Sequence, residues 1–288
     1  MSLLTVSEIL KPCIKQDWAV GAYDVVDIPM CQGVLSAAEI DKAPVILMVY
    51  PKSVSANQFK PLVDFIKHEV HKRSVVAAVA LDHCTDLELI RYSIDVGFTG
   101  VMIDGSMLSF EENLRLSKKV VELAAPYNVS VEAELGHVGE GDELLTDKLR
   151  SSLFTSPSQA KKFIDSSGID ELAIAIGTAH GVYKFEPNLD LELLKEIRSV
   201  TDVGLVLHGS SGTPENQLIS AIQTGIDKLN VYTDIRLEVM KGLDNLFKEK
   251  EVLELDIIDL HKVVRESTCR IVREKNILFN SINKQNVY

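Results

Sequence analysis

Eight short apolar runs alternate with longer amphipathic stretches over the first 235 or so residues, and this alternation limits the fold more than any other feature. The runs lie at residues 18–25, 44–50, 75–81, 100–104, 129–135, 172–177, 203–209 and 227–233. They are mostly continuous, as is typical of parallel strands that are covered on both faces. Eight strand–helix units predict a closed α/β barrel of the (β/α)8 TIM type. An open doubly wound sheet is the main alternative, but no G-x-G-x-x-G motif follows the first run.

Signals for helix ends lie between these runs. Ser109 precedes a helical pattern and Glu112 follows three positions later, which is the spacing of a capping box. Pro214 and Gly225 are expected at the first turn and at the end of another helix. We expect one TIM-barrel domain over residues 1–288, in which about 235–288 form a C-terminal helical extension.

Composition excludes several classes of protein. A net charge of −12 opposes binding to nucleic acids and to anionic membranes. The four cysteines are widely spaced, which argues against a disulfide framework. No apolar run approaches the roughly 20 residues that span a bilayer, and the N-terminus lacks the pattern of a signal peptide. The sequence therefore predicts a cytoplasmic protein without nucleic-acid or membrane partners.

Three histidines follow the third, sixth and seventh strand runs: His83, His180 and His208. In a TIM barrel the carboxyl ends of the strands meet at one face, where active sites lie. Three imidazoles match the ligand set of a catalytic zinc, with a position left open for substrate. Asp104 and Glu134 could supply an alternative metal position. Each histidine alone could be a hydrogen-bonded strand end, but three together favour the metal. The remaining histidines, at positions 68, 71, 137 and 261, are interpreted as surface or packing residues.

A glycine-rich segment, HGSSG at 208–212, precedes the helix near Pro214, and Gly181 lies in a similar turn. Backbone N–H groups at such turns bind anions, and a helix N-terminus adds positive potential. Phosphate is the natural ligand, and Lys184 could add charge. The alternative is that these glycines only form tight turns.

Five motifs together resemble the class II, metal-dependent ketose-bisphosphate aldolases, in the branch of the tagatose- and fructose-bisphosphate enzymes. They are LDH (81–83), VEAELG (131–136), AIGTAHGVYK (175–184), LHGSSG (207–212) and KLNVYTD (228–234). The resemblance covers roughly residues 1 to 240. It implies a lyase of carbohydrate metabolism and glycolysis that reversibly cleaves a ketose 1,6-bisphosphate to dihydroxyacetone phosphate and an aldehyde such as glyceraldehyde 3-phosphate.

The resemblance also implies roles for residues of this chain. The three histidines would hold Zn²⁺, and Asp104 and Glu134 would form a second or alternate metal position. Asp82 would exchange a proton with the C4 hydroxyl, and Asn230 would act beside it. The cradle for dihydroxyacetone phosphate would consist of Gly181, Lys184, Gly209, Ser210, Ser211, Asn230, Val231, Tyr232 and Thr233. A monovalent cation, Na⁺ or K⁺, would lie near the phosphate.

The segment 137–156 is the longest irregular piece, and loops of that length are usually functional or mobile. The family places a second acid–base there. Asp142 fits that position best, although relatives usually have Glu, and Glu140 or Glu143 could serve instead. Relatives are usually dimers or tetramers, so we expect a homodimer or homotetramer, with the apolar faces of the C-terminal helices as candidates for the interface.

Two strand ends depart from the family pattern. Asp24 stands where relatives commonly have Asn, and Tyr50 stands where they have a small hydroxyl residue. In the family these positions help to receive the distal phosphate, which Asp24 would repel and Tyr50 would crowd, although Lys52 could compensate in part. The sequence therefore also admits an aldolase for a ketose 1-phosphate that lacks the distal phosphate.

Two other classes of function compete with this interpretation. A Schiff-base aldolase needs a desolvated lysine, and Lys184 and Lys228 are the lysines near strand ends. A non-catalytic sugar-phosphate sensor is the second alternative. Asp82 and His83 raise a geometric question, because adjacent strand residues point to opposite faces. We expect the chain to leave the strand at Cys84–Thr85, which would let both side chains converge. Cys84 itself is assigned no role.

Overall fold

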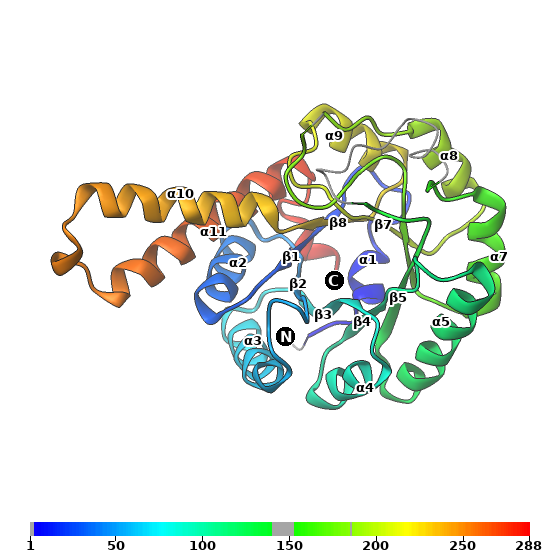
Figure 1. Cartoon of the computed structure of the whole chain (residues 1–288), viewed down its shortest axis with the longest axis horizontal. Coiled ribbons are helices and arrows are strands. Elements are labelled where there is room, and N and C mark those ends of the chain that lie inside the picture. The colour runs from blue at the N-terminus through cyan, green and yellow to red at the C-terminus, as the bar shows by residue number, and fades with distance from the viewer. Residues whose placement is uncertain (1–2, 140–152, 185) are drawn as a thin grey trace.

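A closed barrel of eight parallel strands forms the centre of the computed structural model, which describes residues 3–139, 153–184 and 186–288 (Figure 1). Each strand pairs with its chain neighbours, and the first pairs with the last. The strands are β1 Val20–Asp24, β2 Val45–Val49, β3 Ala77–Cys84, β4 Gly100–Ile103, β5 Ser130–Leu135, β6 Glu171–Ile174, β7 Gly204–Leu207 and β8 Lys228–Val231. All eight predicted strands are present, so the predicted TIM barrel is confirmed.

Helices surround the barrel (Figure 1). The α-helices are α1 Val6–Leu10, α2 Ile28–Asp41, α3 Phe59–Arg73, α4 Leu87–Val96, α5 Phe110–Ala124, α7 Pro157–Ser167, α8 Leu191–Ser199, α9 Glu215–Thr224, α10 Thr233–Glu249 and α11 Ile257–Leu278. Short 3-10 turns lie at η1 Ala56–Gln58, η2 Ala125–Tyr127, η3 Val252–Glu254 and η4 Lys284–Val287. The expected capping box of Ser109 and Glu112 starts α5. Pro214 is the N-cap of α9, one position outside the helix. Within the described chain, no helix has both the length and the apolar character needed to cross a bilayer.

The amino end of the barrel is closed by α1. Val6, Ile9 and Leu10 are buried against residues that point into the barrel, among them Ala22 and Ile46. The hydroxyl of the C-terminal Tyr288 donates to the carbonyl oxygen of Ile9 and ties the last residue to this end. A ligand therefore reaches the barrel from its carboxyl end.

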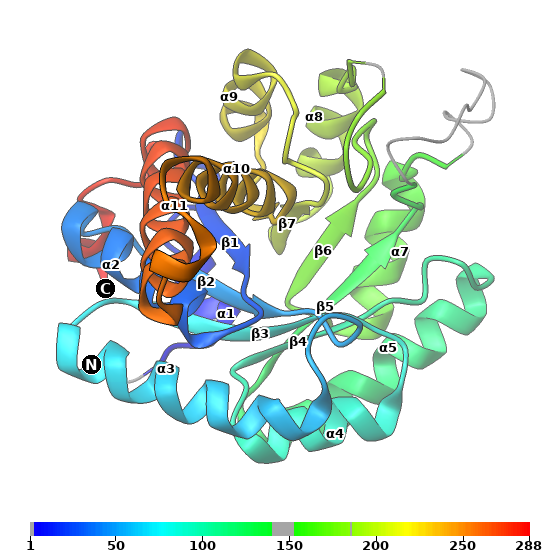
Figure 2. The same cartoon turned by 60° about the vertical axis from the view of Figure 1, so that its left-hand side comes forward.

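The helices α10 and α11 form a long antiparallel hairpin that projects from one side of the barrel (Figures 1 and 2). This is the expected C-terminal extension. The base of α11 packs on α2, where a side chain at Gly33 would lie 2.6 Å from the Thr268 side chain and so would not fit. Large apolar side chains remain exposed on the hairpin, including Met240, Phe247 and Ile258.

The carboxyl end of β3 differs from the expectation. The strand does not stop at Leu81 but runs on to Cys84, and its register against β4 shifts between these two residues. His83 has a φ of 39°, in the left-handed region that non-glycine residues seldom adopt. A bulge inside the strand, rather than an exit from it, lets both Asp82 and His83 face the same cavity.

Candidate active site

A cavity of about 520 Å³ opens at the carboxyl end of the barrel. Most of the predicted site residues line it: Asp24, Tyr50, Asp82, His83, Asp104, Glu134, His180, Gly181, His208, Gly209, Ser211, Asn230, Tyr232 and Thr233. The barrel thus brings residues from strands throughout the chain to one place, as parallel strands with a common direction require.

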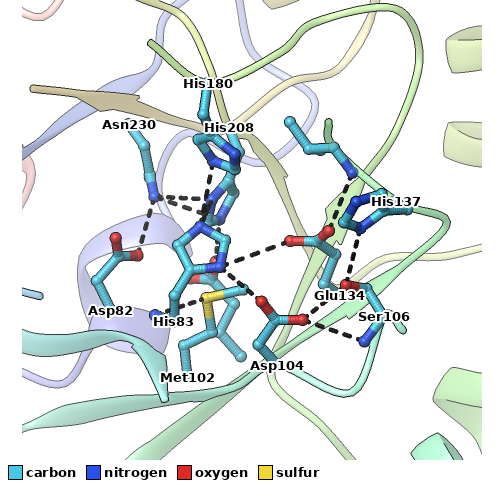
Figure 3. Close-up of polar contacts among 12 residues, drawn as sticks. Asp82, His83, Met102, Asp104, Ser106, Glu134, His137, His180, His208 and Asn230 are labelled. Carbon is cyan, nitrogen blue, oxygen red and sulfur yellow. Dashed lines mark hydrogen bonds and ion pairs between the residues drawn. The ribbon is translucent and has the colours of Figure 1, made fainter. Parts of the chain in front are cut away.

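The three predicted metal ligands converge inside this cavity (Figure 3). The Nε2 atom of His83 lies 2.8 Å from Nδ1 of His208 and 3.2 Å from Nε2 of His180. Tetrahedral zinc with imidazole ligands places ligand nitrogens about 3.3 Å apart. The spacing is therefore close to what a zinc ion needs.

The outward-facing ring nitrogens of these histidines have oxygen acceptors. His83 Nδ1 lies 2.9 Å from Oδ2 of Asp104, and His208 Nε2 lies 2.9 Å from Oε1 of Glu132. His180 hydrogen-bonds to the backbone of Val138. If the outer nitrogens carry the protons, three lone pairs face one another at the centre. Such lone pairs repel each other unless a cation lies between them, so the donor set fits a bound metal.

Carboxylates form a second cluster that shares His83. Asp104 and Glu134 complete a set of oxygen and nitrogen ligands that could hold a metal. Burial raises the pKa of Glu134, and the nearby charge of Asp104 adds to this rise, whereas the imidazoles oppose it. Burial lowers the pKa of His83, but Asp82, Asp104 and Glu134 outweigh it and raise that pKa to about 10. The carboxylates around His83 therefore stabilise a positive charge at this imidazole.

Asp82 lies beside the histidines and is buried. The amide nitrogen of Asn230, on β8, donates to Asp82 Oδ1 over 3.3 Å. This bond links β3 to β8 across the cavity and orients the carboxylate. No hydrogen bond joins Asp82 to the three histidines among the described contacts, so its carboxylate is available to a ligand.

Anion-binding groups lie along the β6, β7 and β8 side of the cavity. The helix α10 begins at Thr233, so its N-terminus faces the cavity. Ser211 Oγ accepts a hydrogen bond from the backbone of Asp234, which leaves the hydroxyl hydrogen for a ligand. Gly209 has a φ of 67°, and a Cβ there would lie 2.3 Å from the carbonyl oxygen of Ala179. The backbones of the two glycine-rich turns are therefore packed against each other, and a side chain at position 209 would not fit between them.

Tyr183 joins these two turns. Its hydroxyl accepts from the backbone N–H of Ala179 and donates to the carbonyl oxygen of Gly209, each over 2.8 Å. The turn that carries Gly181 and the turn that carries Ser211 are thus held at a fixed distance. Sequence reasoning did not assign this tyrosine a role.

Three residues of the predicted cradle do not line the cavity. The Ser210 hydroxyl donates to the carbonyl oxygen of Leu207 and is buried, and Val231 packs in the apolar layer between strands and helices. Their backbone groups alone remain available to a phosphate. Lys184 is exposed and also lies outside the cavity lining. The loop position Asp142, with Glu140 and Glu143, lies outside the described residues.

His137 differs from its interpretation as a surface or packing residue. It lines the cavity, and its Nδ1 lies 3.3 Å from the hydroxyl of Ser106, which donates to Asp104. A chain of hydrogen bonds thus runs from the cavity wall to the carboxylate beside His83. Its position three residues after Glu134, just past a strand end, is the signal that could have placed it here. His68, His71 and His261 are exposed, as expected.

The far side of the cavity contains the two unusual strand ends. One carboxylate oxygen of Asp24 is buried and has no hydrogen-bond partner among the described residues. Burial raises the pKa of Asp24 well above its usual value, and the charge of Asp82 raises it further. The ring of Tyr50 meets the ring of His83 edge-on, with centroids 6.2 Å apart, and the Lys52 ammonium lies 5.8 Å from the Tyr50 ring centre. Arg236, from α10, is a further cation on the wall.

A TIM barrel with clustered histidines and carboxylates at the carboxyl ends of its strands has the arrangement of a metal-dependent barrel enzyme. A model of the class-II fructose-bisphosphate aldolases matches residues 4–284. The chain belongs to this family. It is therefore an aldolase, a carbon–carbon lyase, of a class that depends on a divalent metal, typically zinc.

Relatives with known names differ in substrate. The chain is 34% identical over 291 residues to a sulfofructosephosphate aldolase from Alkalicoccus urumqiensis, and the alignment covers 100% of both chains. It is 36% identical over 268 residues to a fructose-bisphosphate aldolase from Geobacillus stearothermophilus, with 92% of this chain and 91% of the relative covered. Among solved structures, the YdjI aldolase from Escherichia coli K12 is 30% identical, with a TM-score of 0.86 and coverage of 98% and 99%.

Proposed function

We propose that this protein is a zinc-dependent aldolase that reversibly cleaves a ketose phosphate to dihydroxyacetone phosphate and an aldehyde. A fructose- or tagatose-type 1,6-bisphosphate, which would give glyceraldehyde 3-phosphate, is the first candidate substrate. The observation that carries the proposal is the convergence of His83, His180 and His208 with their outer nitrogens bonded to oxygen acceptors.

Each group has a proposed part in the reaction. When bound, a divalent metal supplies Lewis-acid stabilisation of the enediolate charge that appears as the C3–C4 bond breaks. Asp82 takes the proton from the C4 hydroxyl and returns it in the reverse reaction. Asn230 orients the Asp82 carboxylate. The phosphate lies against Ser211, the backbone of the glycine-rich turns and the start of α10. Asp142, the proposed second acid–base, would supply the proton that C3 of the enediolate needs to form dihydroxyacetone phosphate.

Release of dihydroxyacetone phosphate, coupled to a reductase, tests this function directly. The zinc-loaded protein is expected to consume fructose or tagatose 1,6-bisphosphate, or a ketose 1-phosphate, in a stereospecific manner. Dihydroxyacetone phosphate that binds without any cleavage of these substrates would favour the sensor. Borohydride trapping of a substrate adduct after chelation would instead favour Schiff-base chemistry through Lys184 or Lys228.

A second candidate is an aldolase of the same chemistry for a ketose 1-phosphate without a distal phosphate. It is supported by Asp24, because one oxygen of this carboxylate is buried without a hydrogen-bond partner in the described part of the chain. This oxygen would accept a hydrogen bond from a substrate hydroxyl, and the charged carboxylate would repel a dianion. One relative is named for sulfofructose phosphate, which is therefore a further substrate to test. Comparison of kcat/KM across fructose 1,6-bisphosphate, sulfofructose phosphate and fructose 1-phosphate decides between the candidates. A strong preference for the bisphosphate would exclude the second.

Further components of the proposal concern ions and assembly. Asp104 and Glu134 are proposed as a second or alternate divalent position, and a monovalent cation is proposed near the phosphate.

The exposed apolar side chains of the α10–α11 hairpin support assembly into a homodimer or homotetramer. Light scattering coupled to size exclusion tests the assembly, and a monomer at micromolar concentration would exclude it.

A further inference from the structure

A buried ion pair crosses the inside of the barrel below the histidines. Lys228 Nζ on β8 lies 2.5 Å from Oε2 of Glu132 on β5, although these two strands are not neighbours in the sheet. The other oxygen of the same carboxylate lies 2.9 Å from Nε2 of His208. Lys228 and Glu132 are 1% and 5% exposed, and neither lines the cavity. The pair therefore touches a proposed metal ligand without touching the space that a substrate would occupy.

Stability alone does not explain this pair. Removing two charges from water costs several kcal/mol for each ion, and apolar side chains of similar volume fill such a space at equal or lower free energy. The buried carboxyl of Glu171 on β6 lies beside the pair, in register with Glu132, and Ala173 and Val206 lie in the neighbouring apolar layer. The arrangement of contacts points to a role in orientation: the carboxylate is shared between one cation and one imidazole.

The three histidines differ in the charge of their outer partners. His180 bonds to a neutral backbone group, and His83 bonds to Asp104, which lies at the cavity wall. His208 bonds to a carboxylate that has a dedicated counter-ion. A bare carboxylate in this position would add negative charge next to the metal and would weaken its attraction for an enediolate. Lys228 cancels that charge while it leaves one carboxylate oxygen for the imidazole.

We propose that Glu132 and Lys228 form a charge-compensated positioning pair, which fixes the tautomer and ring orientation of His208 so that Nδ1 faces the metal. Glu132 accepts the Nε2–H hydrogen, and Lys228 holds Glu132 in place and neutralises it. Neither residue contacts the substrate. This inference rests on the proposed metal site, because it concerns how one of its ligands is held.

Two double variants separate orientation from packing. Glu132→Leu with Lys228→Met removes both charges and the acceptor, and fills the space with apolar atoms. Glu132→Gln with Lys228→Met removes both charges but keeps an amide oxygen that can accept from His208. The first variant is expected to bind zinc roughly 10- to 100-fold more weakly in chelator competition, and the second is expected to recover most of this loss. With Co²⁺ in place of zinc, the first variant is expected to show a changed visible absorption spectrum.

Glu171→Gln is the matched control. Glu171 is a buried carboxyl of the neighbouring strand β6, in register with Glu132 and close enough to interact electrostatically with the pair, but no hydrogen bond among the described residues joins it to a histidine, so this variant changes a group beside the pair without removing the acceptor of His208. This variant is expected to leave zinc affinity and the Co²⁺ spectrum unchanged. Circular dichroism of each variant establishes that the barrel has folded.

A measurement on the zinc-loaded wild type tests the same point without substitution. Long-range ¹H–¹⁵N spectra are expected to show His208 bound to metal through Nδ1, with a hydrogen-bonded proton on Nε2. Coordination through Nε2, or equal zinc affinity in all three variants, would overturn the inference and leave the metal site intact. A wild type that binds no zinc would instead overturn the proposed function itself.

Discussion

Asp82 and His83 are consecutive residues of one strand, and both side chains face the same cavity. Regular strand geometry forbids this arrangement, because successive side chains alternate between faces. The bulge between Leu81 and Cys84, with His83 at a φ of 39°, removes the alternation at this one point. The proposed proton acceptor and the proposed metal ligand thereby lie side by side on one strand, where the backbone fixes their separation.

Replacing Asp82 by Ala is expected to lower turnover by roughly 10²- to 10⁴-fold, because general acid–base catalysis contributes about that much. The zinc content is expected to stay at the wild-type level, because Asp82 does not belong to either candidate metal cluster. Coupled assays and metal analysis of the same preparation check both values. Loss of zinc together with activity would show that Asp82 is a ligand rather than a base.

Replacing His180 by Ala is expected to remove stoichiometric zinc, because two imidazoles hold zinc far more weakly than three. Chelation of the wild type is expected to abolish cleavage, and added zinc is expected to restore it. Replacement of the exposed His261 by Ala is the control and is expected to change neither quantity. Full activity in the chelated protein would contradict the metal assignment.

Replacing Asp24 by Asn is expected to raise the free energy of unfolding at about pH 8 by about 1–3 kcal/mol, because an unpartnered buried carboxylate is costly and an amide is not charged. The pKa of Asp24 is raised in the folded state by burial and then by Asp82, so the folded chain binds this proton more tightly than the unfolded chain. The wild type therefore loses stability as the pH rises from the unfolded value near 3.9 through the folded pKa.

The stability advantage of the Asp24→Asn variant is accordingly expected to shrink as the pH falls from about 8 toward about 4. Urea unfolding of both chains in the presence of a chelator measures this difference without a contribution from metal. An advantage that grows toward low pH would reverse the sign and contradict the burial argument.

Replacing Gly209 by Ala is expected to raise KM sharply or to lower the free energy of unfolding by more than about 1 kcal/mol, since the new Cβ would overlap the carbonyl oxygen of Ala179. Gly168→Ala is the control, because Gly168 also has a positive φ, of 75°, but a Cβ there meets nothing nearer than 3.7 Å. It is expected to cost some stability through backbone strain and to leave KM unchanged. Equal KM in both variants would indicate that the Gly209 turn does not hold the phosphate.

The fold was predictable because its signal is repeated. Each strand such as β2 or β7 is an apolar run that is buried on both faces, and eight repeats leave few arrangements besides a closed barrel. The convergence of His83, His180 and His208 followed from the common direction of the strands. The apolar pattern of each run and the common direction of the strands were therefore sufficient to predict the barrel and the convergence of the three histidines.

Other features depend on relationships that a linear pattern does not contain. The bulge at His83 is a local change of backbone conformation, and the residue types from Asp82 to Cys84 do not predict it. Lys228 and Glu132 meet across the barrel interior, and no spacing rule joins residues 96 positions apart. The position of His137 depends on how the chain turns after Gly136, which itself has a φ of 83°.

The ion pair between Glu132 and Lys228 also bears on the order in which this chain folds and becomes able to bind metal. Glu132 belongs to the fifth strand and Lys228 to the eighth, so the carboxylate lacks its counter-ion until the last strand has closed the circle. A partly synthesised or partly unfolded chain that lacks the eighth strand would have to bury an uncompensated charge beside His208, which is strongly unfavourable. We therefore expect the sheet to close and the proposed metal site to form together, and we expect fragments that stop short of the eighth strand to remain both open and inactive.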